Sequence, residues 1–176
     1  MLFTNAGVRP GDTVLVQGAG GGVATALVVL GKAAGLRVWV TSRDEAKGAR
    51  AVELGADAAF ANGARLPERV DAVMETVGAA TWSHSVKSLR PGGTIVISGA
   101  TSGPNPAAEL TRIFFLELKV VGSTMGTKEE LAGLLSMCAT TGIRPIIDSV
   151  VPLGDAREAF ERMEKGDLFG KLVLQP

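Results

Sequence analysis

The stretch VLVQGAGGGVATAL, residues 14–27, decides the fold. A short apolar run, Val14–Val16, leads into glycines at Gly18 and Gly20–Gly22. The residues that follow, Val23–Gly35, are apolar on most faces, which predicts a helix buried on more than one side. A strand, a glycine loop and a helix in this order can bind phosphate, because the backbone turns tightly and the helix N-terminus presents free N–H groups.

The glycine pattern is a variant of the dinucleotide-binding motif. Counted from Gly18 and Gly20, the last glycine of a Gly-x-Gly-x-x-Gly motif would fall on position 23, which is Val23. A glycine-rich turn that binds no ligand is therefore the alternative interpretation. The strands and helices that follow favour the phosphate-binding interpretation.

Short apolar runs alternate with helical patterns through most of the chain. Strands are predicted at Val14–Val16, Val38–Thr41, Ala58–Ala61, Val70–Val77, Thr94–Ser98 and Leu118–Gly122, helices at Val23–Gly35, Asp44–Leu54, Thr81–Leu89 and Ala107–Phe115, and a turn at Arg90–Gly93. This alternation is typical of right-handed βαβ units around a parallel sheet. We predict an α/β fold with a doubly wound, Rossmann-type parallel sheet of about six strands.

The C-terminal part departs from this pattern. A helix at Lys128–Thr140 precedes strand patterns at Ile146–Pro152 and Lys171–Leu174, with a helix at Asp155–Lys165 between them. A six-stranded dinucleotide fold does not need these last two strands.

The residues after the second strand indicate which dinucleotide would bind. An acidic residue there would bond the ribose 2′-hydroxyl of NAD. Ser42 and Arg43 stand there instead, with Lys47 about one helical turn later, and a hydroxyl with two cations suits a 2′-phosphate. We expect NADP(H) rather than NAD(H). Alternatively, Arg43 and Lys47 are solvated charges at a helix start where Asp44 and Glu45 complement the helix dipole.

Composition excludes several classes of function. Eighteen basic residues balance eighteen acidic ones, so charge gives no case for nucleic acid or an anionic membrane surface. There is no Tyr, which excludes the tyrosine-dependent catalysis of short-chain dehydrogenases, and one His with one Cys cannot supply a typical zinc site. No metal ligands are assigned. With no targeting or membrane-spanning pattern, we expect a soluble, cytoplasmic protein.

Six stretches together resemble the cofactor domain of the medium-chain dehydrogenase/reductase superfamily, in its zinc-type alcohol dehydrogenase and quinone oxidoreductase branches. They are AGVRPGDTVLVQGAGGGV, TSRDEAKGARAVELGAD, VDAVMETVGAATW, SLRPGGTIVISGAT, ELKVVGSTMGT and GDLFGKLVL. The likeness covers essentially the whole chain. One departure is Ala24, where the family often has Gly.

The resemblance implies a cofactor lying across the carboxyl ends of the strands. The residues implied to bind it are Gly20, Gly21, Gly22 and Val23 at the pyrophosphate, Ser42, Arg43 and Lys47 at the adenosine phosphate, and Thr76, Gly78, Gly99, Ala100 and Thr101 near the ribose and nicotinamide. The loop Ser123–Thr127 is a weaker candidate for the nicotinamide side.

The resemblance also implies a second domain. Family members carry an N-terminal GroES-like domain that supplies the substrate cleft and, in zinc-dependent members, the metal ligands. On this basis residues 1–142 are expected to form the NADP-binding domain, and residues 143–176 to pack on the GroES-like domain. The parent would be an NADP-dependent oxidoreductase that transfers hydride between nicotinamide and an alcohol, carbonyl, enone or quinone. The chain alone, with no catalytic residue assigned, is expected to be inactive.

Two other functions stay open. A non-catalytic NADP-binding or redox-sensing module would share the cofactor and differ in its partner. A methyltransferase also has a glycine loop after its first strand, but Thr41-Ser42-Arg43 lacks the acid it would place at the end of the second strand.

Several single residues have structural interpretations. His84 is expected to be an exposed structural residue and Cys138 a buried, inert thiol. Glu75, odd in a buried strand, is expected to reach solvent at the strand end, and Phe114 and Phe115 are expected to pack in the core.

The sixth strand would be an uncovered sheet edge, and relatives in the family often pair this edge across a two-fold axis. A homodimer through about Lys119–Thr124 is therefore expected.

Overall fold

A computed structural model describes all residues from Met1 to Pro176. Its main sheet has the order β3-β2-β1-β4-β5-β6, and every neighbouring pair is parallel. The strands are β1 (Thr13–Gln17), β2 (Arg37–Ser42), β3 (Ala58–Ala61), β4 (Val70–Glu75), β5 (Leu89–Ile97) and β6 (Lys119–Gly122). The predicted six-stranded, doubly wound sheet is confirmed.

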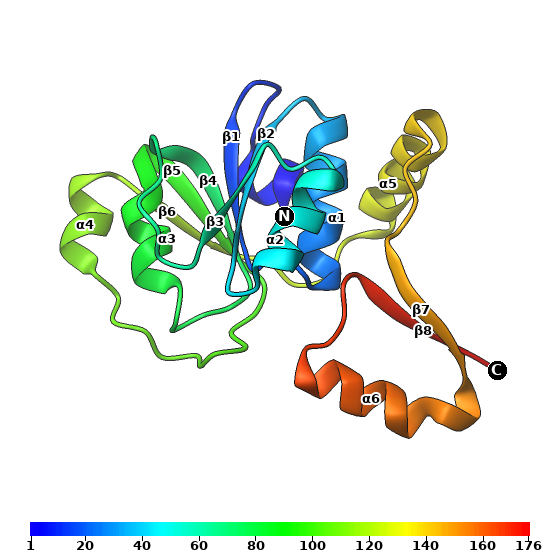
Figure 1. Cartoon of the computed structure of the whole chain (residues 1–176). Coiled ribbons are helices and arrows are strands. Elements are labelled where there is room, and N and C mark those ends of the chain that lie inside the picture. Colours follow the sequence, from blue (N-terminus) through cyan, green and yellow to red (C-terminus); the bar gives the residue numbers. More distant parts are fainter.

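Helices cover both faces of this sheet (Figure 1). The helices are α1 (Gly22–Ala33), α2 (Glu45–Glu53), α3 (Trp82–Ser88), α4 (Leu110–Phe115), α5 (Lys128–Thr141) and α6 (Ala156–Lys165), with short turns η1 (Leu2–Ala6) and η2 (Leu153–Asp155). α1 and α2 lie on one face, whereas α3 and α4 lie on the other. No helix has the length and apolar character needed to cross a membrane.

The core consists of two clusters, one on each face of the sheet. Because side chains alternate along a strand, Val14 and Val16 face α1, while Leu15 between them faces α3. On the second face Trp39 joins Leu15, together with Trp82 from α3. The chain therefore leaves β1 and β4 toward opposite faces, and the strand order reverses between these two strands.

The predicted turn at Arg90–Gly93 is wrong, because these residues belong to β5. Leu89 pairs with Val70, and the register shifts between Val70 and Ala72, so the extra residues form a bulge. Gly92 has φ 76°, a left-handed conformation that glycine adopts without strain. The Pro-Gly-Gly signal therefore marks a strand irregularity rather than a strand boundary.

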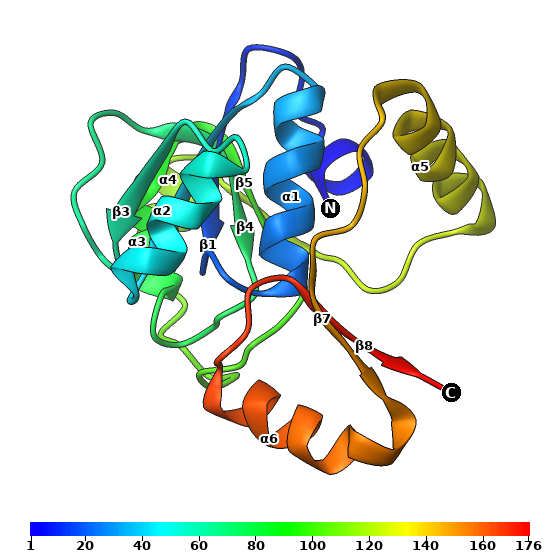
Figure 2. The same cartoon turned by 45° about the vertical axis from the view of Figure 1, so that its right-hand side comes forward.

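Two predictions about burial are also wrong. Phe114 and Phe115 are 64% and 74% exposed and stack on each other, with ring centres 4.7 Å apart. Ile113 and Leu118 pack against the core in their place. Cys138 is only partly buried, because α5 stands apart from the sheet and buries no residue (Figure 2).

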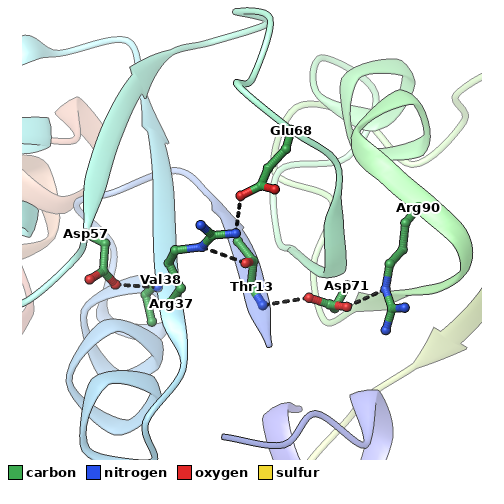
Figure 3. A network of polar contacts seen from close by, with 7 residues as sticks. All are labelled: Thr13, Arg37, Val38, Asp57, Glu68, Asp71 and Arg90. Carbon is green, nitrogen blue, oxygen red and sulfur yellow. Dashed lines mark hydrogen bonds and ion pairs between the residues drawn. The ribbon is translucent and has the colours of Figure 1, made fainter. Parts of the chain in front are cut away.

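Polar side chains close the amino ends of the central strands (Figure 3). The backbone N–H of Thr13 donates to Asp71 at 2.7 Å, and Nε of Arg37 donates to the Thr13 hydroxyl at 2.8 Å. Arg90 pairs with Asp71, and Arg37 pairs with Glu68. This network ties β1, β2 and β4 together at the amino end and leaves the carboxyl end of the sheet open.

The C-terminal part forms a separate two-stranded parallel sheet from β7 (Ile147–Pro152) and β8 (Lys171–Gln175), with α6 between them. The unit reaches below the main sheet in Figures 1 and 2. Phe169 anchors it, since this ring is 2% exposed and belongs to the core cluster of α1. The guanidinium carbon of Arg50 lies 4.2 Å from the centre of the Phe169 ring.

Candidate functional site

A cleft of about 920 Å³ lies at the carboxyl ends of the strands. The residues that follow β1, β2, β3, β4 and β5 all line it, and the C-terminal unit closes one side. It includes the point between β1 and β4 where the strand order reverses, which is where open parallel sheets bind ligands. Its size suits a nucleotide-sized ligand.

The glycine loop forms the floor of the cleft at the start of α1. Gly21 is the N-cap of this helix, with no side chain capping the first turn and no acidic residue in it. A Cβ atom built on Gly21 meets nothing within 4 Å. The first turn of an α-helix has N–H groups without intrahelical partners and a partial positive charge. The loop therefore presents an open, positively polarised surface.

Two lysine side chains lie against this loop. A Cβ built on Gly20 would come within 2.8 Å of Cδ of Lys47, and one built on Gly22 within 2.6 Å of Cε of Lys171. Lysines and a helix N-terminus at one place favour an anion with more than one negative charge.

The C-terminal unit carries Lys171 to the loop. Gly170 pairs with Gly21 as an isolated parallel bridge. Asp148 of β7 holds the segment before Lys171 in place, because it accepts the N–H of Phe169 at 2.9 Å. That hydrogen bond, with help from Ser149 and Arg162, holds the pKa of Asp148 below its ordinary value of 3.8 despite partial burial.

The adenosine end predicted from sequence lies after β2. The Ser42 hydroxyl donates to the carbonyl of Asp44 at 2.6 Å, and Asp44 caps α2 by accepting the N–H of Lys47 at 3.2 Å. Lys47 also donates from its ammonium group to the carbonyl of Gly166. Arg43 is exposed and takes part in none of the four ion pairs. Ser42, Arg43 and Lys47 all line the cleft.

The other end of the cleft lies after β4 and β5. Thr76, Gly99 and Thr101 line it, whereas Gly78 and Ala100 are not among the lining residues. Gly78 has φ 91°, and a Cβ on it would come within 2.9 Å of Cα of Ala100. The loops after β4 and β5 therefore approach each other closely at these two residues. All the other predicted cofactor residues line it, but no residue of Ser123–Thr127 does.

Sequence reasoning missed two lining residues with useful chemistry. Asn62 follows β3 at the same sheet edge, so the rule that placed Ser42 and Thr76 could have found it. Lys171 could not be found in this way, because its position depends on the docking of a distant segment.

Glu75 and His84 differ from their expected exposure. Glu75 is 0% exposed, and the N–H groups of Val77 and Gly78 satisfy its carboxylate at 2.8 and 3.0 Å. His84 is half-buried, and its Nε2 lies 2.9 Å from the carbonyl of Ala64. The structural role predicted for His84 fits this contact, whereas the solvent exposure predicted for both residues is wrong.

No three His, Cys, Asp or Glu side chains come together in a way that could hold a metal ion.

Comparison with known proteins identifies relatives of the chain. A family model described as zinc-binding dehydrogenase matches residues 22–140. An alcohol dehydrogenase of Geobacillus stearothermophilus is 33% identical over 96% of the chain and 52% of its own length. The quinone oxidoreductase of Mus musculus is 31% identical over 98% of the chain and 57% of its own length. The chain thus spans about half the length of these relatives.

Solved structures agree with the fold. A mycobacterial protein solved in complex with NADPH has a TM-score of 0.86 at 29% identity, over 97% of the chain and 58% of its own. A structure described as an NAD-dependent alcohol dehydrogenase has a TM-score of 0.88 at 34% identity, over 97% of the chain and 53% of its own. Similar folds thus occur in proteins described with either cofactor.

Proposed function

The chain belongs to the zinc-binding dehydrogenase family, and we propose that its cleft binds NADP(H) as the cofactor-binding domain of an oxidoreductase. The observation that carries the proposal is the open glycine loop at the N-terminus of α1, beside Lys47 and Lys171. A dinucleotide pyrophosphate has the charge that this arrangement favours.

The residues at the pyrophosphate position fit such a group. Gly21 leaves the space in which a phosphate would approach the backbone, and the first turn of α1 offers N–H donors. The ammonium group of Lys171 supplies a positive charge beside Gly22, at the start of the helix. Gly20, Gly22 and Val23 complete this part of the site.

The residues after β2 support NADP(H) over NAD(H). Asp44, the acid nearest to the place where a ribose 2′-hydroxyl would be recognised, already caps α2. Arg43 has no partner in the four ion pairs and is free to meet a 2′-phosphate. Ser42 and Lys47 add a hydroxyl and a second cation at this end of the cleft.

The reaction we propose is hydride transfer between the nicotinamide and an alcohol, carbonyl, enone or quinone. NADP(H), when bound, supplies or accepts the hydride. The titratable residues that line the cleft are Arg43, Asp44, Lys47 and Lys171, which all belong to the adenosine and pyrophosphate ends. We therefore assign no catalytic residue here, and propose that substrate binding and proton transfer belong to the other half of a longer oxidoreductase, with this chain alone inactive.

A single substitution tests the pyrophosphate site without unfolding α1. Asp is a favoured N-cap residue and the backbone of Gly21 has φ −74°, so Gly21→Asp should leave the helix intact. Its carboxylate would compete with a phosphate for the N–H groups and repel it. The fluorescence change of NADPH on binding should be lost in Gly21→Asp and kept in the control Gly133→Asp on α5, where a Cβ also meets nothing within 4 Å. Equal NADPH binding by both variants would contradict the proposed site.

A further inference from the structure

A buried chain of hydrogen bonds runs beneath the cleft. Gln17, Thr41 and Glu75 are the polar members at the ends of three strands, and each is 0% exposed. Each stands directly before a residue that lines the cleft, namely Gly18, Ser42 and Thr76. We propose that Gln17 and Glu75 are positioning residues, which hold the glycine loop and the loop after β4 in register for one dinucleotide. The proposal rests on the proposed function.

The hydrogen-bond chain can be followed from donor to acceptor. The N–H of Gly18 donates to the Thr41 hydroxyl at 3.3 Å, and that hydroxyl donates to Oε1 of Gln17 at 2.6 Å. Nε2 of Gln17 donates to the Ser85 hydroxyl at 2.9 Å. Because the Ser85 oxygen accepts from this amide, its own proton points to Oε2 of Glu75, at 2.5 Å. Every bond in the chain thus runs toward the Glu75 carboxylate.

The carboxylate gathers further donors at its own end. Oε1 of Glu75 accepts the N–H groups of Val77 and Gly78, and both of its oxygens lie within 2.9 Å of the Thr81 hydroxyl. Glu75 takes part in none of the four ion pairs. Backbone N–H groups can only donate, and they take Oε1, while the Ser85 hydroxyl donates to Oε2, so both oxygens of Glu75 serve as acceptors.

His84 fixes the orientation of the Gln17 amide. Nδ1 of His84 lies 2.9 Å from Nε2 of Gln17, which is a donor, so Nδ1 accepts. Nε2 of His84 then carries the proton and donates to the carbonyl of Ala64. With Nδ1 accepting and Nε2 donating, the two shorter contacts of the ring leave Gln17 a single orientation and the hydrogen-bond chain a single direction, and the Ser88 hydroxyl lies 3.4 Å from Nε2.

The hydrogen-bond chain holds backbone groups that belong to the cleft rather than to the apolar core. Gly18 and Val77 both line the cleft, and a Cβ on Gly18 would be 3.5 Å from Cγ2 of Val77. The two loops therefore meet at the floor of the cleft, at the place between the pyrophosphate and the nicotinamide ends. A shift of the loop after β4 would misplace one half of a dinucleotide and leave the other half in position.

The affinities for two ligands distinguish a positioning role from a general effect on the stability of the fold. NADPH would contact both loops, whereas adenosine 2′,5′-bisphosphate lacks the nicotinamide half. Glu75→Gln turns an acceptor oxygen into an amide that faces donors, so NADPH affinity should fall about tenfold while that of the bisphosphate changes less than about twofold. Ser85→Ala removes only the link between Gln17 and Glu75 and should lower NADPH affinity about threefold, again selectively.

A matched control and a second variant keep this test decisive. Ser88→Ala is also on α3 and also removes a buried hydroxyl. That hydroxyl donates to the carbonyl of His84 at 2.8 Å and lies 3.4 Å from Nε2 of His84, but it forms none of the bonds between Gln17 and Glu75, so both affinities should stay unchanged. If Glu75→Gln does not fold, Ser85→Ala carries the test. Equal losses for both ligands, or an unchanged NADPH affinity, would overturn the positioning role. Failure of the unaltered protein to bind either ligand would overturn the proposed function instead, and this inference with it.

Discussion

The backbone N–H of Gly170 donates a hydrogen bond to the carbonyl oxygen of Gly20, with 3.0 Å between nitrogen and oxygen. The bond joins the C-terminal unit to the glycine loop, although the two segments lie at opposite ends of the sequence. The next residue, Lys171, thereby reaches the N-terminus of α1. The C-terminal unit is thus part of the wall of the cleft.

Replacing Lys171 should weaken binding of both nicotinamide cofactors alike. The proposed partner of Lys171 is the pyrophosphate, which NADPH and NADH share, so Lys171→Met should lower both affinities about tenfold at low salt. The loss should shrink as ionic strength rises, because salt screens the charge. Titrations followed by cofactor fluorescence measure both effects. The control is Lys165→Met, a lysine on α6 that does not line the cleft, and a Lys171→Met protein that matches this control would refute the role.

Removing the Phe169 ring should detach the C-terminal unit locally. Phe169→Ala removes a buried aromatic side chain, a change that typically costs about 3–5 kcal/mol. We expect faster hydrogen exchange at the Gly170 amide and faster proteolysis near residues 166–171, with the main sheet still folded. Phe115→Ala, which truncates a ring that is 74% exposed, is the control. Undiminished protection of the Gly170 amide in Phe169→Ala would show that other contacts hold the unit.

The sequence predicted the sheet and most of the cleft for a simple reason. Apolar periodicity marks strands and helices, and parallel strands bring their carboxyl ends to one edge, so Ser42, Thr76 and Gly99 could be placed together. Features that depend on residues distant in the sequence could not be predicted. The burial of Glu75 depends on donors from α3, and the place of Lys171 depends on the docking of Phe169.

Local patterns also failed where two outcomes share one signal. A Pro-Gly-Gly run such as that at Arg90–Gly93 suits a turn and a bulge equally well. The helical pattern before β6 does not reveal which of its aromatic residues faces the core, and Ile113 rather than Phe114 does so. The apolar face of α5, which includes Leu131 and Leu135, was recognised, but no part of the chain covers it.

Asp57 should make stability depend on pH on the acid side. Burial alone would raise its pKa, but a hydrogen bond from Lys32 and one from the N–H of Val38, with the charges of Lys32 and Arg37, leave the pKa below its ordinary value of 3.8. Figure 3 shows the bond to Val38. A carboxyl whose pKa is lower in the folded state stabilises the fold above its unfolded pKa, and this contribution disappears as pH falls through the folded pKa.

Asp57→Asn should therefore destabilise the protein at pH 7 and progressively less as pH drops below about 4. Urea unfolding of both proteins across this range measures the difference. Glu164→Gln, which removes an exposed carboxylate with no ion pair, should show no such trend. A constant difference between Asp57→Asn and the unaltered protein at all pH values would contradict this account of the carboxylate.

We propose that the free edge of β6, at about Lys119–Thr124, pairs with a second copy of the chain. β6 pairs with no strand other than β5, and Val120 on it is 44% exposed. Light scattering should then give twice the mass of one chain, and Val120→Lys should reduce it to that of one chain because a charge blocks edge pairing. Val52→Lys, at a similarly exposed position on α2, should stay dimeric. A mass of one chain for the unaltered protein at high concentration would rule out this dimer.

The central claim is that the cleft binds a dinucleotide and prefers the one with a 2′-phosphate. Parallel calorimetric titrations of the unaltered chain with NADPH and NADH test it most directly, with Arg43→Ala as the second protein. We predict that NADPH binds more tightly, and that Arg43→Ala loses most of this preference while NADH affinity is unchanged, since only NADPH has the phosphate that Arg43 would meet. Tighter binding of NADH, or equal losses for both cofactors in Arg43→Ala, would contradict the preference, and no binding of either cofactor would contradict the site itself.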